Sequence, residues 1–198
     1  MGDFQNDSVD GSGVKVLPEG TYFAGSFDSA GPQGQCIKKG YDYYYSGSWL
    51  NGKQEGYGEE QVNELHYVGD FSEGLRNGNG KATWKNGDSY EGKWQDGEPH
   101  GQGIYKWQDG RIYNGTLVSG KFHGKGTYEW PDGKYYDGEY KEGVKHGWGV
   151  YVSDGGCRYE GYWENGRQHG EGKMVDKNGQ VTKSGLWVSG RMGDKKTS

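Results

Sequence analysis

The sequence predicts an all-β protein, an elongated single-layer antiparallel sheet of stacked β-hairpins. Three observations predict this fold: glycine supplies 41 of the 198 residues, most of these glycines recur with a fixed period, and aromatic residues alternate with them at period 2. Abundant glycine with few aliphatic residues is typical of disordered chains unless the glycines are periodic. The periodicity therefore favours an ordered repeat protein.

The chain consists of similar segments of 22 to 24 residues, which begin at Phe23, Tyr45, Tyr67, Tyr90, Tyr113, Tyr136, Tyr159 and Lys183. Counted from that first residue, glycine recurs at repeat positions 3, 8, 12, 14 and 21, which hold 36 of the 41 glycines. The predicted organisation is a disordered tail (1–10), a repeat array (11–191) and a second disordered tail (192–198). The array comprises a half unit, seven full units from Phe23 and a terminal half unit.

The first half of each unit is predicted to be a strand that ends in a tight turn. In Tyr90-Glu91-Gly92-Lys93-Trp94, alternation along a strand places the two rings and the glycine on one face. Glu91 and Lys93 then face the opposite, solvated side. An Asn-Gly, Asp-Gly or Glu-Gly step follows at positions 7 and 8, and such steps favour two-residue turns because they tolerate positive φ.

The second half of each unit is predicted to be the returning strand. Its pattern, Gly-x-Gly-x-Tyr-x-Trp, again places glycines and rings on one face, and an Asp-Gly step such as Asp109-Gly110 leads into the next unit. Glycine weakens a strand unless packing requires it. We therefore expect aromatic rings to lie against bare glycines of adjacent strands, Gly101 and Gly124 among them. One hairpin cannot bury these rings alone, so the units must stack.

The pattern Tyr-x-Gly-x-Trp-x-x-Gly-x-x-x-Gly-x-Gly-x-Tyr resembles the MORN repeat over about residues 11–191. The first two units depart from it, since Ala30 and Cys36 replace glycines in one and residues 59–66 lack the glycine turn of the other. Terminal units commonly differ because they cap an array. The resemblance implies a structural scaffold or adaptor. Similar repeat-only proteins belong to ciliary axonemes, radial-spoke heads or cortical cytoskeletal assemblies, and some clasp a motor-protein tail.

The polar residues do not suggest catalysis or metal binding. Histidines at repeat position 11 should lie about 10 Å apart, too far to share a zinc ion, so we interpret them as structural. Cys36 and Cys157 lie five repeats apart, which excludes a disulfide between them and fits a reducing cytoplasmic compartment. No catalytic set departs from the repeat, so we expect no enzyme, cofactor or metal. The four histidines are His100, His123, His146 and His169.

The aromatic face is the candidate functional feature. A single-layer sheet should leave part of this face exposed as a long groove, and large exposed aromatic surfaces commonly mark partner sites. We predict that the groove binds a peptide or helix of an axonemal, cytoskeletal or motor-tail protein, in the cytoskeleton or cilium. The candidate groove residues are Tyr90, Trp94, Tyr105, Trp107, Tyr113, Tyr128, Trp130, Tyr136, Tyr140, Tyr151, Tyr159 and Trp163.

Other partners are less favoured by the sequence. The net charge of −5 argues against nucleic-acid binding. Peripheral membrane binding through phosphoinositides is the main alternative, because basic residues recur near positions 9 and 10, although acidic residues interrupt the row. A choline- or glucan-binding repeat is a weaker alternative, and the two open sheet edges would permit a homodimer. The basic row comprises Lys53, Arg76, Lys121, Lys145, Arg167 and Arg191.

Overall fold

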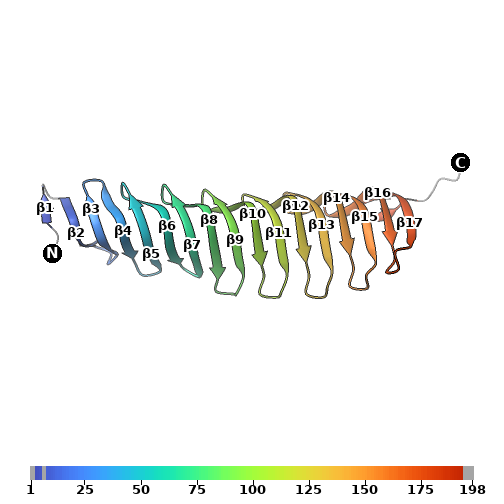
Figure 1. Cartoon of the computed structure of the whole chain (residues 1–198), viewed down its shortest axis with the longest axis horizontal. Helices are drawn as coiled ribbons and strands as arrows, with labels where there is room; N and C mark the ends of the chain where they lie inside the picture. Colours follow the sequence, from blue (N-terminus) through green and yellow to red (C-terminus); the bar gives the residue numbers. More distant parts are fainter. Residues whose placement is uncertain (1–2, 6–7, 194–198) are drawn as a thin grey trace. The chain divides into compact units, whose positions relative to one another are not determined.

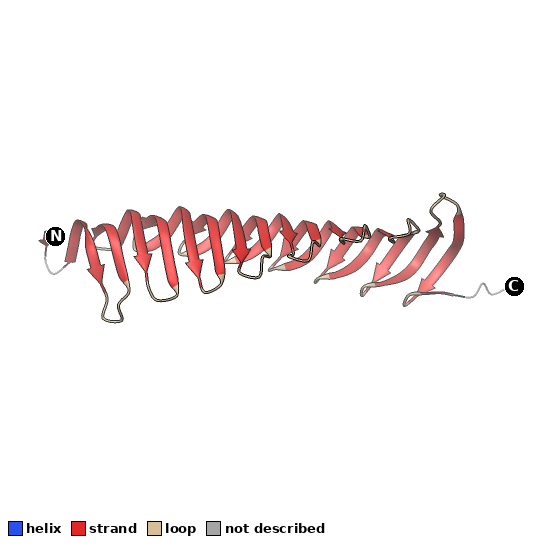
Figure 2. Ribbon diagram, turned by 90° about the horizontal axis from the view of Figure 1, so that it is seen from below, coloured by secondary structure: helices blue, strands red, loops and turns tan. Residues whose placement is uncertain are grey.

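A computed structural model describes residues 3–5 and 8–193, and the chain divides into two compact units, Met1–Glu98 and Pro99–Ser198. The described residues contain strands joined by short loops and no helix (Figure 2). Within each unit every strand pairs antiparallel with the next one along the chain. The predicted all-β class and the hairpin arrangement are confirmed.

The first unit contains strands that follow one another in chain order (Figure 1). Each repeat contributes two of them, one on either side of the turn at positions 7 and 8. The strands are β1 (Asp3–Gln5), β2 (Ser8–Val16), β3 (Tyr22–Asp28), β4 (Gly31–Lys39), β5 (Tyr43–Leu50), β6 (Lys53–Val62), β7 (Leu65–Ser72), β8 (Leu75–Trp84) and β9 (Ser89–Gln95).

The second unit repeats the same alternation of strands and turns. Its strands are β10 (Glu98–Lys106), β11 (Ile112–Val118), β12 (Lys121–Glu129), β13 (Tyr135–Lys141), β14 (Val144–Val152), β15 (Arg158–Glu164), β16 (Arg167–Val175), β17 (Val181–Val188) and β18 (Arg191–Met192).

The terminal segments differ in part from the predicted tails. Within residues 1–10, expected to be disordered, Asp3–Gln5 form β1, which pairs with β2 in the register Asp3↔Asp10. Residues 1–2 and 6–7 lie outside the described part of the chain. At the other end β18 closes at Met192, and residues 194–198 of the predicted tail also lie outside it.

The turns at positions 7 and 8 have the predicted conformation. Glu142 and Gly143 have φ values of 50° and 86°, so both central residues lie in the left-handed region. The Gly143 amide also donates a hydrogen bond to the Phe122 carbonyl of the preceding unit, with an N–O distance of 2.9 Å. The same bond recurs from Gly166 to Lys145 at 2.9 Å. These turns therefore link successive hairpins as well as closing their own.

The second connection of most units uses the glycine at position 21. Gly110 has φ 89°, and its amide donates to the Trp107 carbonyl at 3.0 Å. The unit that begins at Tyr45 has no glycine there. Its turn passes instead through Asn63, which adopts φ 50°, and asparagine tolerates this region better than most residues. The departure in residues 59–66 therefore keeps a tight turn without glycine.

A buried tyrosine at position 1 is the centre of the six repeats that begin at Tyr45, Tyr67, Tyr90, Tyr113, Tyr136 and Tyr159. Tyr113 and Tyr136 are fully buried, and each hydroxyl donates to the backbone carbonyl three residues later, at 2.8 Å and 3.0 Å. The Tyr113 ring covers paired glycines on two strands, because a Cβ would lie 2.6 Å from its hydroxyl oxygen at Gly115 and 2.5 Å at Gly126. The predicted packing of rings on bare glycines is thus confirmed at positions 3 and 14.

The glycine at position 12 has a different purpose from the one we predicted. A Cβ on Gly124 would meet only the Thr116 side chain, at 3.7 Å, so the expectation that a ring packs on Gly124 is wrong. Gly124 has φ 60° and Gly101 has φ 67°. Gly124 also lies where the β11–β12 register shifts, which marks a β-bulge. This glycine is required for its backbone conformation.

The ring at position 5 connects neighbouring repeats. Trp163 packs edge-on against Tyr159 of its own unit and Tyr136 of the preceding one, with both centroid distances at 5.3 Å. Its indole Nε1 donates to the Gly149 carbonyl at 3.2 Å. Trp94 packs in the same way between Tyr90 and Tyr67. Edge-to-face pairs contribute about 0.5–1.5 kcal/mol each beyond area burial, so the stacking holds adjacent hairpins together.

The packing of the first full repeat, which begins at Phe23, accounts for the cysteine that replaces a glycine at its position 14. Phe23 has no hydroxyl to place over position 14, where Cys36 replaces glycine and is buried. The Cys36 thiol donates to the carbonyls of Ser26 and Gln33, at 3.1 Å and 3.2 Å. The thiol therefore takes the place that the phenol and the bare glycine share in later units.

Replacing Gly126 with alanine should lower the free energy of unfolding by about 2–3 kcal/mol, because the new methyl group would overlap the Tyr113 ring. Gly143→Asn is the matched control. A Cβ there meets nothing within 4 Å, and asparagine tolerates the φ of 86°. Urea unfolding of both variants measures the difference. Equal midpoints for Gly126→Ala and Gly143→Asn would contradict the packing argument.

The fold should lose stability steeply above about pH 10. Burial raises the pKa of Tyr90 and Tyr159 to about 12, and it also raises the pKa of Tyr45, Tyr67 and Tyr136 above the ordinary value of 10.0. Unfolded tyrosines ionise first, so the stability present below pH 10 is lost as the pH rises toward the folded pKa. Tyrosinate absorbance and circular dichroism should therefore change together for these residues. Their full ionisation in a still-folded chain would refute this.

Candidate functional site

Burial divides the twelve predicted groove residues into two groups. Seven have exposed fractions of at most 7%, so their side chains form the interior of the array rather than a binding surface. They are Tyr90, Trp94, Tyr113, Tyr136, Tyr140, Tyr159 and Trp163. Five are half-buried and offer part of each ring to solvent, namely Tyr105, Trp107, Tyr128, Trp130 and Tyr151. All five belong to the second unit.

The five half-buried residues form one continuous row of rings, which we call the aromatic row. Tyr105 and Trp107 have ring centroids 4.5 Å apart, and Trp107 lies 5.2 Å from Tyr128. Tyr128 lies 4.5 Å from Trp130, which lies 6.1 Å from Tyr151. These side chains come from repeat positions 16 and 18, where each returning strand ends. The row is therefore a repeated surface that runs across β10, β12 and β14.

A cation lies over the rings near each end of the aromatic row. The Arg111 guanidinium lies 5.0 Å from the Trp107 ring centroid and donates to the Tyr128 hydroxyl at 3.1 Å. It is also paired with Asp109, at 2.7 Å. Lys145 lies at the other end, beside Trp130 and Tyr151. The row therefore combines apolar ring surface with positive charge.

Lys145 is enclosed by aromatic rings. Its Nζ lies 4.6 Å from the centroids of Tyr136 and Tyr151, 4.8 Å from Trp163 and 5.2 Å from Trp130. Such positions favour a cation, because the ring faces are electrostatically negative. Burial nevertheless lowers the pKa of Lys145 to about 8, because the ammonium loses hydration. The sequence placed Lys145 only in a basic row near a turn and gave no sign of this enclosure.

Three of the six residues of the predicted basic row are neutralised by neighbouring carboxylates. Lys53 pairs with Glu73 at 2.5 Å, and Lys121 pairs with Glu142 at 3.0 Å. Arg76 donates from Nε to the buried Glu60 carboxylate at 2.8 Å. These pairs reduce the positive charge that the row could present to an anionic surface.

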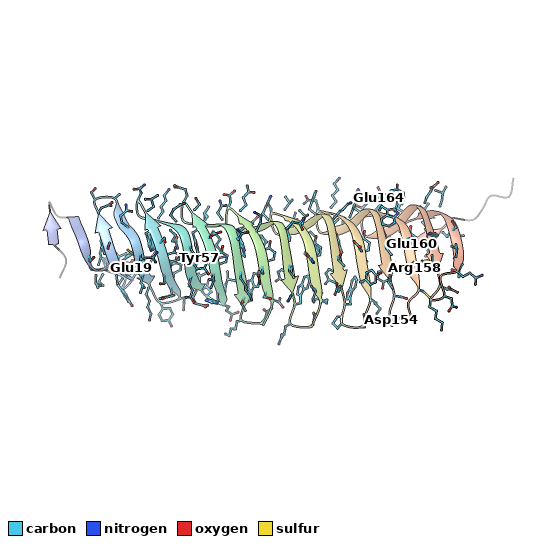
Figure 3. All side chains as sticks on the ribbon, in the orientation of Figure 1. Glu19, Tyr57, Asp154, Arg158, Glu160 and Glu164 are labelled. Carbon is cyan, nitrogen blue, oxygen red and sulfur yellow. The ribbon has the colours of Figure 1, made fainter. Side chains whose placement is uncertain are left out.

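The opposite face of the second unit carries an apolar patch that the sequence analysis missed. Trp148, Tyr162 and Leu186 are 48%, 52% and 63% exposed, and they line a shallow hollow that also includes Glu160. Arg158 and Lys173 both pair with the Glu160 carboxylate. Arg158 and Glu160 both belong to β15 (Figure 3). The signal was present in the repeat register. Large apolar residues stand at positions 4 and 13, which hold polar residues in most other units.

The histidines at position 11 are half-buried, and they do not form a ligand cluster with other side chains. Over residues 3–5 and 8–193, no group of three or more His, Cys, Asp or Glu side chains is arranged to hold a metal ion. His123 Nδ1 is fully buried without a hydrogen-bond partner. Cys36 and Cys157 are both free thiols, the first buried and the second exposed. No described helix has the length and apolar character needed to cross a membrane.

Lys145 should make stability depend on pH below the range in which tyrosines ionise. Its folded pKa of about 8 lies under the ordinary value of 10.5, so the unfolded chain binds the proton more tightly. The free energy of unfolding should therefore rise by about 1–2 kcal/mol between pH 7 and about 9.5. Lys145→Met, which keeps the apolar stem, should abolish this rise. Urea unfolding across the range measures it, and parallel profiles for both chains would contradict the assignment.

Comparison with known proteins agrees with the repeat structure. A family model described as the MORN repeat matches residues 45–61, 67–89, 90–110, 113–135, 136–158 and 159–181. No curated protein matches the chain. The matched segments begin at the position-1 tyrosines that are buried in the structure.

Among solved structures, the chain is similar to the TCP10 domain of Danio rerio CPAP in complex with a peptide of Danio rerio STIL. That match has 11% identity and a TM-score of 0.35, and it covers 89% of this chain and 99% of the other. Virginiamycin B lyase from Staphylococcus aureus matches with 11% identity and a TM-score of 0.18, over 86% of this chain and 68% of the other. Likeness at this level does not extend to function. The repeated match to the family model covers well over half of the sequence, and the chain belongs to the MORN repeat family.

Proposed function

We propose that this chain is a non-enzymatic repeat scaffold that binds a segment of another protein along the aromatic row. The observation that carries the proposal is the continuity of the row from Tyr105 to Tyr151, with each ring half-exposed. Tyrosine and tryptophan lose little conformational entropy when a partner covers them, and they dominate the energetics of many interfaces. Lys145 adds positive charge that could orient the partner, whereas the charge of Arg111 is largely balanced by Asp109.

The rigid layer beneath the row suits this role. Tyr151 lies against a ring that is itself buried, since Trp163 contacts it and is only 7% exposed, and Trp130 in turn contacts Tyr151. A surface supported in this way needs little reorganisation when a partner binds. The repeat also presents the same pair of positions at successive returning strands, which fits an elongated peptide or a helix better than a small ligand.

The location that we propose is the cytoskeleton, with the ciliary axoneme as one setting. The support is the extent of the array, which occupies nearly all of the described chain, as in repeat-only MORN proteins of such assemblies. Within this proposal the chain acts by holding a partner, because the polar side chains serve turns and surface ion pairs. Phosphoinositide binding is less favoured, because Lys53, Arg76 and Lys121 are engaged by carboxylates.

The double substitution Trp107→Ala and Trp130→Ala should lower partner affinity at least tenfold, because the two largest rings of the row, on either side of Tyr128, would be lost. The measurement is co-purification from the native cell together with a photo-crosslinker placed at Tyr128. Trp148→Ala, on the opposite face, is the matched control and should leave binding unchanged. A crosslinker at Tyr162 should give no product.

Three results would overturn the proposed function. One is partner retention that survives loss of both tryptophans, and another is crosslinking from Tyr162 in place of Tyr128. The third is strong, salt-sensitive sedimentation with vesicles that contain acidic phosphoinositides. That last result would support the membrane alternative, because electrostatic attraction to lipid weakens as salt rises.

A further inference from the structure

Two cations occupy the same place in different repeats. Arg76 and Lys145 both stand at repeat position 10 and lie over the position-1 tyrosine of their own unit. The Arg76 guanidinium carbon lies 5.3 Å from the Tyr67 centroid and 5.7 Å from Trp94. Lys145 Nζ has the equivalent neighbours, Tyr136 and Trp163. In other units this position holds Pro32, Gln54, Pro99, Phe122 and Gln168.

The counter-charge differs between the two places. Arg76 has Glu60, whose carboxylate accepts hydrogen bonds from Nε and Nη2 at 2.8 Å and 2.5 Å. Glu60 stands at position 16 of the unit before Arg76, and the residue at that position before Lys145 is Tyr128. Over the described part of the chain, no carboxylate oxygen lies within 4.0 Å of Lys145 Nζ. The chain thus supplies an anion to one cation and none to the other.

The Lys145 ammonium remains within reach of a ligand. It forms no hydrogen bond within residues 3–5 and 8–193, although an ammonium has three donors. The fully buried side-chain atoms without a partner in that part of the chain are His123 Nδ1 and Tyr140 Oη, and Lys145 Nζ is not among them. Nζ therefore combines a large loss of hydration with some remaining solvent access.

We propose that Lys145 anchors an acidic side chain of the protein segment that binds the aromatic row. The inference rests on the proposed function and names the chemistry of the partner: an aspartate or glutamate flanked by apolar residues. The carboxylate would accept hydrogen bonds from Nζ, in the way that Glu60 accepts them from Arg76. The flanking apolar residues would cover Trp130 and Tyr151.

The surroundings of Lys145 favour a carboxylate over a phosphate. Phosphate recognition commonly uses the bidentate fork of arginine or several converging donors. Lys145 is a single point charge surrounded by rings. A charge-assisted hydrogen bond gains strength where water is already excluded. The lowered pKa of Lys145, to about 8, agrees with that exclusion.

The test is selection of binders from a random twelve-residue phage-displayed library on the immobilised full chain. Peptides are kept if the Trp107→Ala, Trp130→Ala double variant fails to bind them. We expect these peptides to share an aspartate or glutamate. Lys145→Met should lower the affinity of these peptides at least tenfold, which corresponds to the contribution of a charge-assisted hydrogen bond. Replacing the acidic residue of the peptide by its amide should lower the affinity by a similar factor. The two changes combined should lower the affinity little more than either change alone.

Controls separate the charge from the fold and from the row itself. Lys145→Gln serves as a second variant, and at pH 7 neither variant should melt at a lower temperature than the parent chain, because each removes a charge that burial disfavours. Trp148→Ala should leave peptide affinity unchanged. Absence of any peptide that depends on Trp107 and Trp130 would overturn the proposed function and this inference together. Peptides that need the row but lack an acidic residue, or tolerate Lys145→Met, would overturn this inference alone. Displacement of an acidic peptide by millimolar inorganic phosphate would also overturn the carboxylate assignment.

Discussion

The structure depends on one contact, the tyrosine ring at repeat position 1 lying over a pair of glycines on adjacent strands. At Tyr113 the pair is Gly115 and Gly126, whose Cα atoms face each other so closely that a Cβ on Gly115 would lie 2.5 Å from the Gly126 Cα. Neither strand can carry a side chain there, and the ring fills the space that both leave. Its hydroxyl also satisfies a backbone carbonyl. Glycine, usually a weak residue in strands, becomes the residue that creates the core.

Because this contact constrains the residue type at so many repeat positions, only a few positions are free to vary between repeats. Positions 1, 3, 5 and 14 are committed to the ring-on-glycine layer, and positions 7, 8 and 12 to backbone conformations that favour glycine or asparagine. Position 10 can vary, since its side chain only covers the tyrosine. It is Phe122 in one unit, stacked 3.8 Å from Tyr113, and Lys145 in the next. The buried layer of rings on glycines is the same in successive repeats, whereas the residue at position 10 that covers it differs. Each repeat can therefore present a different side chain at the same place.

Much of the fold followed from sequence because its signals are local. The turn steps, the period-2 pattern and the glycine register each act over a few residues, and they place the strands well. The reason for each glycine was harder to predict. Positions 3 and 12 look alike in sequence, but Gly115 avoids a ring whereas Gly124 supplies a left-handed bulge. Sequence also could not separate the buried Tyr136 from the half-buried Tyr151, which share a face. Both rings contact Trp163 of the following repeat, with a centroid distance of 5.3 Å for Tyr136 and 6.5 Å for Tyr151. The difference in burial therefore depends on the placement of a ring from another repeat, which is a long-range property.

Arg76 and Lys145 occupy the same repeat position but differ in their counter-charge, and this difference bears on which of them could bind a partner. Taking a cation out of water is unfavourable, and proteins commonly offset this with a paired anion. Arg76 has such an anion in Glu60. At Lys145, within residues 3–5 and 8–193, the compensation comes from ring faces, which is weaker than an ion pair with full hydrogen bonding. An unpaired, partly desolvated ammonium lowers the stability of the free protein, and binding of an anion to it would then release more free energy. The repeat before Lys145 has Tyr128 at the position where the repeat before Arg76 has Glu60. Under the proposed role of Lys145, the missing anion would come from the partner, and the stabilisation would then belong to binding instead of folding.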